Sequence, residues 1–515
     1  MLLRATRVES EQLNSLDLFD RVAILYVVLP VPLFLFGWLR LWAAVPLTLC
    51  VLYSLRSLVA PRSAERATFP VSRMQLTVAC LVACVWTLLG GTGHVVFANY
   101  DWHIRDAVLH DLVVSSWPVS YGIPGGGESL LRAPLGFYLP AALVGKLLGL
   151  GAAHLAMALW TATGATLFLL QVLSLTAARP RAALLVAAVI VFFSGFDIIG
   201  MAMSNPGRFL KYWNIAQHLE AWAGRYQYSS MTTQLFWVPN HALAAWLTIG
   251  LLGRDSRRSL DTLLPMIVVA TALWSPLSAM GLVPFVLLKV LPRDRLLACL
   301  RPQVWGPALL VGLVIASYLV MDSSRVPFKW NLTGGGLVDL PFDLTRQLQF
   351  FLLEVGLIGF VVLALRWSWE VVLALVVLLL LPTVSFGPAN DLVMRASIPS
   401  LAVLAIAACE ALTRPNTVGT DTQKKLVLGG MLCIGAVTPI QEMARALLLP
   451  TFPINMTATL IGAACGEYLP HYTAHVNGQF VTRLLKEPRE IPLGPQGPEA
   501  CSDPAHDMMV ARGLL

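Results

Sequence analysis

Long apolar runs recur along almost the whole chain, and they constrain the fold more than any other feature. An α-helix rises about 1.5 Å per residue, so it needs about 20 mostly apolar residues to cross about 30 Å of hydrocarbon. The runs that approach this length are residues 22–39, 41–58, 74–97, 153–175, 182–203, 236–252, 262–275, 277–291, 304–321, 348–365, 371–386, 397–412 and 426–443. The sequence therefore predicts an all-α fold, a polytopic transmembrane bundle of about thirteen helices.

Composition supports this class of protein. Of the 515 residues, 57% are hydrophobic and only 13% are charged, whereas soluble domains carry about 25% charged residues. The lipid bilayer is thus the expected surrounding. The formal net charge of +7 fits cationic cytoplasmic loops, and we expect no nucleic-acid partner. Four acids and no apolar core occupy the first twenty residues, so no cleavable signal peptide is predicted.

Positive charge predicts the orientation, because Lys and Arg stay preferentially in cytoplasmic loops. The cationic connections are residues 4–21, 56–73, 179–181, 254–258, 289–301, 366 and 414–425. All of them fall on one side only if residues 262–291 form a hairpin that turns at Ser275-Pro276. The apolar stretch 134–149, which contains Lys146, is then predicted to be a juxtamembrane helix along the outer face. The N-terminus is expected in the cytoplasm and the C-terminus outside.

Three parts follow from this topology. Residues 1–73 are an N-terminal cytoplasmic segment with two extra transmembrane helices. Residues 74–412 are a transmembrane core whose main outer loops are 99–133, 204–235 and 322–347. Residues 413–515 comprise the last transmembrane helix and an extracytoplasmic tail, which is rich in Pro and charge from residue 444 and is predicted to be partly ordered. Whether Cys465 and Cys501 of this tail form a disulfide stays open.

The first outer loop carries the most chemistry. Asp101 lies just after a predicted helix, and Arg105 follows at the spacing that pairs two side chains on one helix face. His103 and Asp106 lie beside them. Ionisable groups next to hydrocarbon have shifted proton affinities, which acid–base chemistry requires. A loop that is polar only because it is wet, with Asp101 as a plain helix cap, is the alternative interpretation.

Cations also stand among aromatic residues in the second outer loop and after it. Arg208 and Lys211 lie near several Tyr and Trp residues, which suits a phosphate or sugar site, although an interfacial aromatic belt has the same composition. His241 is predicted at the outer mouth of the next helix, where it is either functional or a packing histidine. No Cys/His set has zinc-site spacing.

The order of several short segments resembles the GT-C superfamily of membrane glycosyltransferases, in particular its bacterial branch of protein mannosyltransferases and aminoarabinose transferases. The resemblance covers about residues 74–412, in layout more than in identity. The matching segments are Asp101 after a membrane helix, the interfacial stretch 134–149, the proline-aromatic segment 132–140, the basic turn 177–182, the hairpin at Trp274-Ser275-Pro276 and the arginine-then-proline segment 395–399.

This resemblance implies an inverting glycosyltransferase in a bacterial cytoplasmic (inner) membrane. Such an enzyme moves a sugar from a polyprenyl-phosphate donor to an extracytoplasmic glycan, lipid or protein. Asp101 would be the general base, with His103 orienting or replacing it. The family commonly has an acidic pair here, whereas in this chain Trp102 and His103 follow Asp101. This difference from the family leaves the identity of the base open. The implied substrate-binding residues are Arg105, Asp106, Arg132, Arg208, Lys211, His241 and Arg395, and Arg395 has the best family position. Participation of a divalent metal stays open.

Two rival functions are compatible with the sequence. A transporter or lipid flippase would need ionisable residues in mid-helix and an internal repeat. No repeat is visible, and Glu354 and Glu410 are the acids that lie well inside apolar runs. A non-catalytic protein of the same fold, acting in envelope assembly, is not separated from an enzyme by sequence.

Overall fold

The chain folds mainly into helices that suit a membrane. The computed structural model describes residues 18–59, 71–123, 127–176, 180–204, 206–207, 214–224, 226–254, 260–331, 344–416, 419–464, 469, 471–476 and 480–491. Eight helices in these ranges are long and apolar enough to cross a membrane: Leu18–Trp38, Leu41–Leu58, Leu150–Leu175, Pro180–Ser204, Pro302–Leu319, Leu344–Leu365, Asp391–Thr413 and Asp421–Leu448. These helices support a multi-pass membrane protein.

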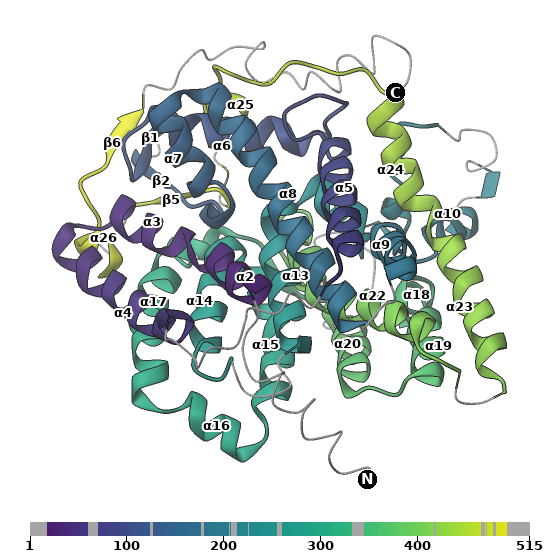
Figure 1. Ribbon diagram of the computed structural model, residues 1–515. Coiled ribbons are helices and arrows are strands. Elements are labelled where there is room, and N and C mark those ends of the chain that lie inside the picture. Colours follow the sequence, from purple (N-terminus) through teal and green to yellow (C-terminus); the bar gives the residue numbers. More distant parts are fainter. Residues whose placement is uncertain are drawn as a thin grey trace.

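Helices account for nearly all the regular structure (Figure 1). The α-helices before residue 260 are α2 (Leu18–Val28), α3 (Pro30–Trp38), α4 (Leu41–Val59), α5 (Arg73–Leu89), α6 (Asp101–Val114), α7 (Leu139–Leu148), α8 (Leu150–Leu175), α9 (Ala183–Phe192), α10 (Asp197–Ser204), α12 (Met231–Trp237) and α13 (Pro239–Arg254). Those after it are α14 (Leu264–Trp274), α15 (Pro276–Val290), α16 (Arg293–Cys299), α17 (Pro302–Leu319), α18 (Leu344–Phe351), α19 (Leu357–Leu365), α20 (Trp369–Leu380), α21 (Asp391–Ala396), α22 (Ile398–Thr413), α23 (Asp421–Gly435), α24 (Val437–Leu448), α25 (Leu460–Ala463) and α26 (Phe480–Leu484).

Shorter helical turns connect these helices. They are the 3₁₀ turns η1 (Leu135–Phe137), η2 (Pro180–Ala182), η3 (Leu219–Ala223), η4 (Ser323–Arg325) and η7 (Leu381–Thr383), and the π-helical turn η6 (Leu352–Gly356). A π turn inserts an extra residue per turn and often marks a functional position within a helix.

The predicted hairpin at Ser275 is confirmed. Ser275 separates α14 from α15 in extended conformation, and its hydroxyl accepts the Ser278 backbone N–H at 3.2 Å as the cap of α15. At the far ends of the two helices, Asp261 before α14 and Arg295 after α15 form an ion pair at 3.6 Å. The chain therefore returns to the end of the bundle from which it came.

Basic connections gather at this same end of the bundle, here called the basic end. Arg254 pairs with Asp20 at 2.8 Å, and Arg366 pairs with Glu410 at 2.8 Å. These contacts join the starts of α2 and α20 to the ends of α13, α19 and α22. The end lies around α16 at the bottom of Figure 1. Three of the predicted cationic connections, those of Arg254, Arg295 and Arg366, thus lie at one end of the bundle, while their side of a membrane stays a prediction.

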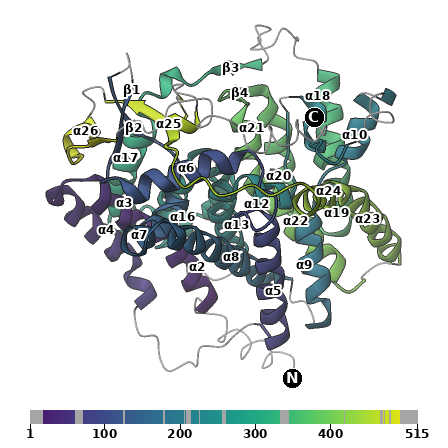
Figure 2. The same ribbon diagram turned by 90° about the horizontal axis from the view of Figure 1, so that it is seen from above.

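Burial is distributed as expected for a bundle in lipid. Every side chain of α13 from Pro239 to Leu252 is buried, and α22 is almost as fully enclosed; Figure 2 shows both helices inside the bundle. Helices at the periphery instead expose large apolar side chains, such as Leu81 of α5 and Leu155 of α8. In water such a surface would be costly, whereas hydrocarbon accepts it.

Two predicted helices end earlier or are interrupted. The helix predicted at residues 74–97 ends at Leu89, because the glycine-rich segment that follows adopts positive φ at Gly91 and Gly93, where a helix cannot continue. The helix predicted at residues 182–203 is broken between Phe192 and Asp197 into α9 and α10.

The expectation of a purely α-helical fold needs one correction, because two small sheets are present. β1 (Val119–Ile123) and β2 (Gly127–Leu131) form a hairpin, which β5 (Thr473–His475) and β6 (Arg489–Ile491) extend in the order β5-β2-β1-β6. β3 (Phe328–Trp330) pairs with β4 (Val384–Phe386), which replaces the end of the helix predicted at residues 371–386. Pairings across so long a sequence separation leave no local pattern.

The tail and the juxtamembrane stretch also acquire definite positions. In the described part of the tail, up to Ile491, β5 and β6 pair with the β1–β2 hairpin, while α25 packs on α6 and α26 packs on α17. Cys465 and Cys501 lie outside the described residues. The stretch 134–149 contains η1 and α7, as predicted, and α7 packs on α6 and α8. With ten residues, α7 is too short to cross a membrane.

Candidate functional site

A pocket of about 400 Å³ lies at the end of the bundle opposite the basic end, and we call this the pocket end. Its polar lining consists of Arg132, His241, Ser323, Asp391, Arg395, His471 and Tyr472. Its apolar lining includes Leu277, Met280, Leu319, Phe328, Phe386 and Leu392. The pocket thus combines a cationic wall with a larger apolar surface, which suits a ligand that has an anionic head and an apolar chain.

Asp101 and Arg105 are held next to this pocket by the start of α6. Arg105 donates to Asp101 Oδ2 at 2.7 Å, to Asn240 Oδ1 at 2.8 Å and to the Trp237 carbonyl oxygen. The predicted pairing of these two residues on one helix face is therefore present. Arg105 is 2% exposed, whereas the Asp101 side chain is 35% exposed. Asp101 is thus anchored by a buried cation while one side of it stays accessible.

Three cationic or imidazole groups named from the sequence meet in the pocket. Arg132 follows β2 and donates to the Leu319 carbonyl oxygen at 2.6 Å. Arg395 projects from α21 and forms an ion pair with Asp391. His241, in the first turn of α13, is hydrogen-bonded through Nδ1 to the Ser275 hydroxyl at 2.7 Å. The hairpin at Ser275 therefore fixes one wall of the pocket.

The tail closes the pocket with His471 and Tyr472, just before β5. Burial raises the pKa of the Tyr472 hydroxyl; Arg105 and Arg395 oppose this shift, and Asp101 adds to it. Arg105 and Asp101 therefore lie close to the same hydroxyl group as Arg395. The start of α6 and the lining of the pocket thus belong to one site. Burial lowers the pKa of His471 to about 4, and the positive charges of Arg395 and Arg132 add to the effect. His471 is consequently neutral at neutral pH in the empty pocket.

The other residues named from the sequence lie elsewhere. Asp106 is 1% exposed and forms ion-pair contacts with His94 at 2.9 Å and His154 at 3.8 Å. His103, on α6 like Asp106, is also buried, and neither residue lines the pocket. Arg208 and Lys211 lie outside the described residues. The structure thus brings together Asp101, Arg105, Arg132, His241 and Arg395 out of the nine candidates.

A second polar cluster lies deeper in the bundle, and sequence reasoning identified only Glu354 of its members. We call it the acid cluster: Asp197, Glu220, Glu354 and Glu442. All four side chains are at most 4% exposed. Of the other three acids, Glu220 lies in a predicted loop, Asp197 lies within the apolar run 182–203, and Glu442 lies at the end of the run 426–443. Their burial makes each hydrogen-bond partner important, because an unsatisfied buried carboxylate is costly.

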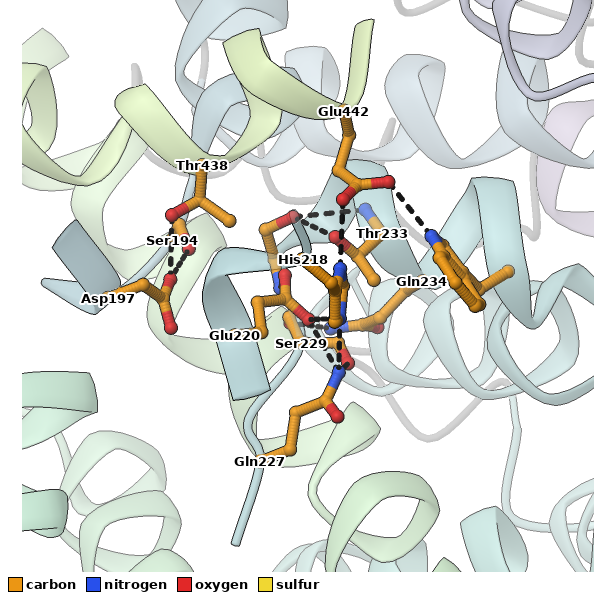
Figure 3. Close-up of polar contacts among 12 residues, drawn as sticks. Ser194, Asp197, His218, Glu220, Gln227, Ser229, Thr233, Gln234, Thr438 and Glu442 are labelled. Carbon is orange, nitrogen blue, oxygen red and sulfur yellow. Dashed lines mark hydrogen bonds and ion pairs between the residues drawn. The ribbon is translucent and has the colours of Figure 1, made fainter. Parts of the chain in front are cut away.

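His218 lies between Glu442 and Glu220 of the acid cluster (Figure 3). Its Nδ1 contacts Glu442 Oε1 at 2.9 Å, and its Nε2 lies 3.6 Å from Glu220 Oε2. Burial lowers the pKa of His218, but Glu442 and Glu220 outweigh burial and raise it overall. Burial raises the pKa of Glu220 to about 7. Glu220, which lies outside the spanning helices, therefore titrates near neutral pH.

One tryptophan connects the acid cluster to the pocket. The Trp237 indole N–H donates to Glu442 Oε2 at 2.9 Å, while the carbonyl oxygen of the same residue accepts from Arg105. Arg445 supports this arrangement by donating to Glu442 Oε1 at 2.9 Å. The position of Arg105, and through it that of Asp101, therefore depends on contacts within the acid cluster.

Sequence reasoning missed three lining residues of the pocket, His471, Tyr472 and Asp391. The first two lie in the Pro-rich tail, more than 300 residues after Asp101. Asp391 could have been found, since it precedes Arg395 at the i, i+4 spacing of an ion pair on a helix. Among the described residues, no group of three or more His, Cys, Asp or Glu side chains is arranged to hold a metal ion.

Comparisons with known protein families, with curated proteins and with solved structures find no match to this chain.

Proposed function

We propose that the protein is a membrane glycosyltransferase that takes a sugar from a polyprenyl-phosphate donor and transfers it to an acceptor outside the cytoplasm. One observation carries this proposal. Cations from parts of the chain far apart, Arg132, Arg395 and Arg105, meet one accessible carboxylate beside a pocket whose wall is largely apolar. The layout resemblance to GT-C glycosyltransferases is consistent with this arrangement.

The pocket suits such a donor at both of its ends. The phosphate would lie against Arg132 and Arg395, because guanidinium groups form short, charge-assisted hydrogen bonds to phosphate oxygens. The polyprenyl chain would follow the apolar wall at Leu277, Met280 and Leu319. In this proposal the pocket end faces the outside of a bacterial cytoplasmic membrane and the basic end faces the cytoplasm.

The chemical step assigns a role to each side of the site. The acceptor oxygen attacks the anomeric carbon and its proton passes to Asp101, the general base. The bond between the anomeric carbon and the phosphate oxygen breaks, and the electron pair leaves with the phosphate. Arg395 and Arg132 stabilise that developing negative charge. Attack opposite to the leaving group inverts the configuration at the anomeric carbon.

Substitution of Asp101 tests the proposal. In a transfer assay with polyprenyl-phosphate sugars, Asp101→Asn should lower kcat about 100-fold or more, because a general base contributes on the order of 10²–10⁴. Binding of the donor should change little, since Arg105 keeps its bonds to Asn240 and Trp237. Glu370→Gln, which alters an exposed carboxylate at the basic end, is the matched control and should keep full turnover.

Three results would contradict the proposal in different ways. Full turnover by Asp101→Asn would remove this residue from the mechanism. Donor binding without any glycosidic product would favour a non-catalytic assembly protein. Movement of the intact donor between leaflets, without transfer of the sugar, would favour a lipid flippase, to which the buried acids inside the bundle are also suited.

A further inference from the structure

Asp197 and Glu354 lie where three helices of the bundle are interrupted. Asp197 is the first residue of α10, directly after the break that separates it from α9. Glu354 lies in the π turn η6, 10 residues from the start and 11 from the end of the span Leu344–Leu365. The junction of α23 and α24 packs against the same place, because Gly435 lies against the carbonyl oxygen of Ser194. The two carboxyl groups are thus about halfway along the bundle.

Each carboxyl group has one oxygen atom that is fully engaged by donors. Asp197 Oδ2 accepts from the Ser194 hydroxyl at 2.9 Å and from the Thr438 hydroxyl at 2.8 Å, as Figure 3 shows. Glu354 Oε1 accepts from the Trp222 indole N–H at 2.6 Å. These donors fix both carboxyl groups in orientation.

The other oxygen of each group has no donor. Asp197 Oδ1 and Glu354 Oε2 are buried and lack a hydrogen-bond donor, and the two side chains, 1% and 2% exposed, lie next to each other. Gly195 permits this approach, since a Cβ atom there would lie 2.6 Å from Glu354 Oε2. Two negative charges in contact inside hydrocarbon would repel strongly, so a positive charge must lie between the two oxygens.

A proton fits the space between these oxygens and a metal ion does not. Ca²⁺ and Mg²⁺ take about six oxygen ligands or more. Here two carboxyl oxygens without a donor, Asp197 Oδ1 and Glu354 Oε2, are available. The neighbouring Ser194 and Thr438 hydroxyls point their hydrogens at Asp197 and so cannot act as ligands in the same orientation. One hydrogen between two carboxyl oxygens satisfies both of them.

We propose that Asp197 and Glu354 form a proton-binding site in which one proton is shared between the two carboxyl groups and is held by Glu354. Asp197 is the better anion, because it receives two hydroxyl donors and lies at the positive end of α10. The titratable groups that act on the pair from neighbouring segments are Glu220 and His218 around η3 and Tyr228 before α12. This site does not depend on the glycosyltransferase proposal.

The assignment predicts an asymmetry between two amide substitutions. Glu354→Gln mimics the protonated acid, since its amide N–H₂ donates to Asp197 Oδ1 and its oxygen still accepts from Trp222. Asp197→Asn instead places an amide donor against the donor of Glu354. The thermal unfolding temperature of the full-length protein should therefore be kept in Glu354→Gln and lowered in Asp197→Asn.

Infrared spectroscopy of the purified protein in lipid nanodiscs measures the proton directly. A buried protonated carboxyl group gives a C=O band that shifts when the buffer is changed from H₂O to D₂O. The wild type should show this band, and Glu354→Gln should lose it. The matched control is Glu410→Gln, which removes another buried acid that is neutralised by Arg366 at 2.8 Å and should leave the band unchanged.

Each opposite outcome overturns the proposal. A band that survives in Glu354→Gln would show that Glu354 does not carry the proton. Tolerance of Asp197→Asn together with unfolding of Glu354→Gln would reverse the assignment. A rise in unfolding temperature in sodium compared with choline chloride, present in the wild type and absent in Glu354→Gln, would identify a metal-ion site.

Discussion

The pocket and the acid cluster both gather ionisable groups inside an apolar bundle, but they differ in charge and access. The pocket is rich in cations, open, and lined by a long apolar wall. The acid cluster is rich in carboxylates, and all four of its acids are at most 4% exposed. Trp237 links the two regions, because its indole donates to Glu442 and its carbonyl oxygen accepts from Arg105 beside the pocket.

The two regions differ in the groups that offset their buried charges. In the acid cluster, partners within the protein neutralise the acids: His218 and Arg445 lie against Glu442, and hydroxyl groups bind Asp197. In the pocket, Asp101 holds Arg105 and Asp391 holds Arg395, and the guanidinium groups of Arg132 and Arg395 belong to the lining, where they can meet an anionic ligand. The pocket is thus suited to binding, and the acid cluster to holding protons and structure.

Among the substitutions that compare the pocket with other regions, that of Arg395 should produce the largest effect. Arg395→Ala should lower kcat/KM for a polyprenyl-phosphate sugar about 100-fold, equal to about 2.7 kcal/mol, because it removes a donor to the leaving phosphate. It also leaves Asp391 to repel the phosphate. Arg366→Ala, which removes an arginine from a comparable ion pair at the basic end, should affect transfer far less.

A transfer assay, together with donor binding measured on the same preparations, checks this. Equal losses in both arginine variants would mean that the effect comes from general stability and not from the pocket. Arg395→Lys should recover part of the activity, since it restores the charge without the two-pronged geometry of a guanidinium group.

The sequence predicted the elements more successfully than the contacts between them. Each of the thirteen apolar segments is helical over most of its length, and the hairpin at Ser275 followed correctly from the positions of cationic loops. Asp101, Arg132 and Arg395 were named from local motifs and a layout resemblance, and they do converge. Helix formation and loop charge are local properties, so a single sequence reveals them.

The rest depends on pairings that no local pattern records. β5 joins β2 through register pairs such as Ser129 and His475, which are 346 residues apart, and only this pairing brings His471 to the pocket. Asp197 went unnoticed because it lies in an apolar run that looks like one continuous helix. The break before it is stabilised by tertiary contacts, including the bond from the Phe196 N–H to the Leu353 carbonyl oxygen.

The close packing around the acid cluster should make it sensitive to added volume. A Cβ atom at Gly195 would lie 2.6 Å from the backbone of Glu354, so Gly195→Ala should cost about 1–3 kcal/mol in the free energy of unfolding through overpacking. Gly430→Ala on α23 is the matched control, because no atom lies within 4 Å of its added methyl group. That change should stabilise the helix by about 0.5–1 kcal/mol.

Thermal and denaturant unfolding of both variants in the same detergent measures this difference. A Gly195→Ala protein as stable as the wild type would show that the π turn η6 moves to make room for the added methyl group. The acid cluster would then be less rigid than its close packing indicates. Donor binding should be little altered, since Gly195 is not part of the pocket lining.

The smallest predicted effect concerns pH and the pocket. The pKa of His471 is lowered to about 4 in the empty pocket, first by burial and then by Arg395 and Arg132. A bound phosphodiester partly neutralises these arginines and raises the pKa again, so binding takes up a proton. The uptake favours binding as the pH falls, and a pKa that recovers to about 6 would make the affinity about tenfold higher at pH 5 than at pH 7.

Isothermal titration with a polyprenyl phosphodiester, which does not itself titrate in this range, measures this dependence. His471→Gln should make the affinity nearly independent of pH between 5 and 7. His475→Gln is the matched control, because that histidine is hydrogen-bonded to Ser129 at 2.9 Å and does not line the pocket. If His471→Gln kept the wild-type slope, the proton would be taken up elsewhere, and Glu220 of the acid cluster, whose pKa burial raises to about 7, would be the first group to test. The pocket and the acid cluster would then act as one electrostatic unit through Trp237.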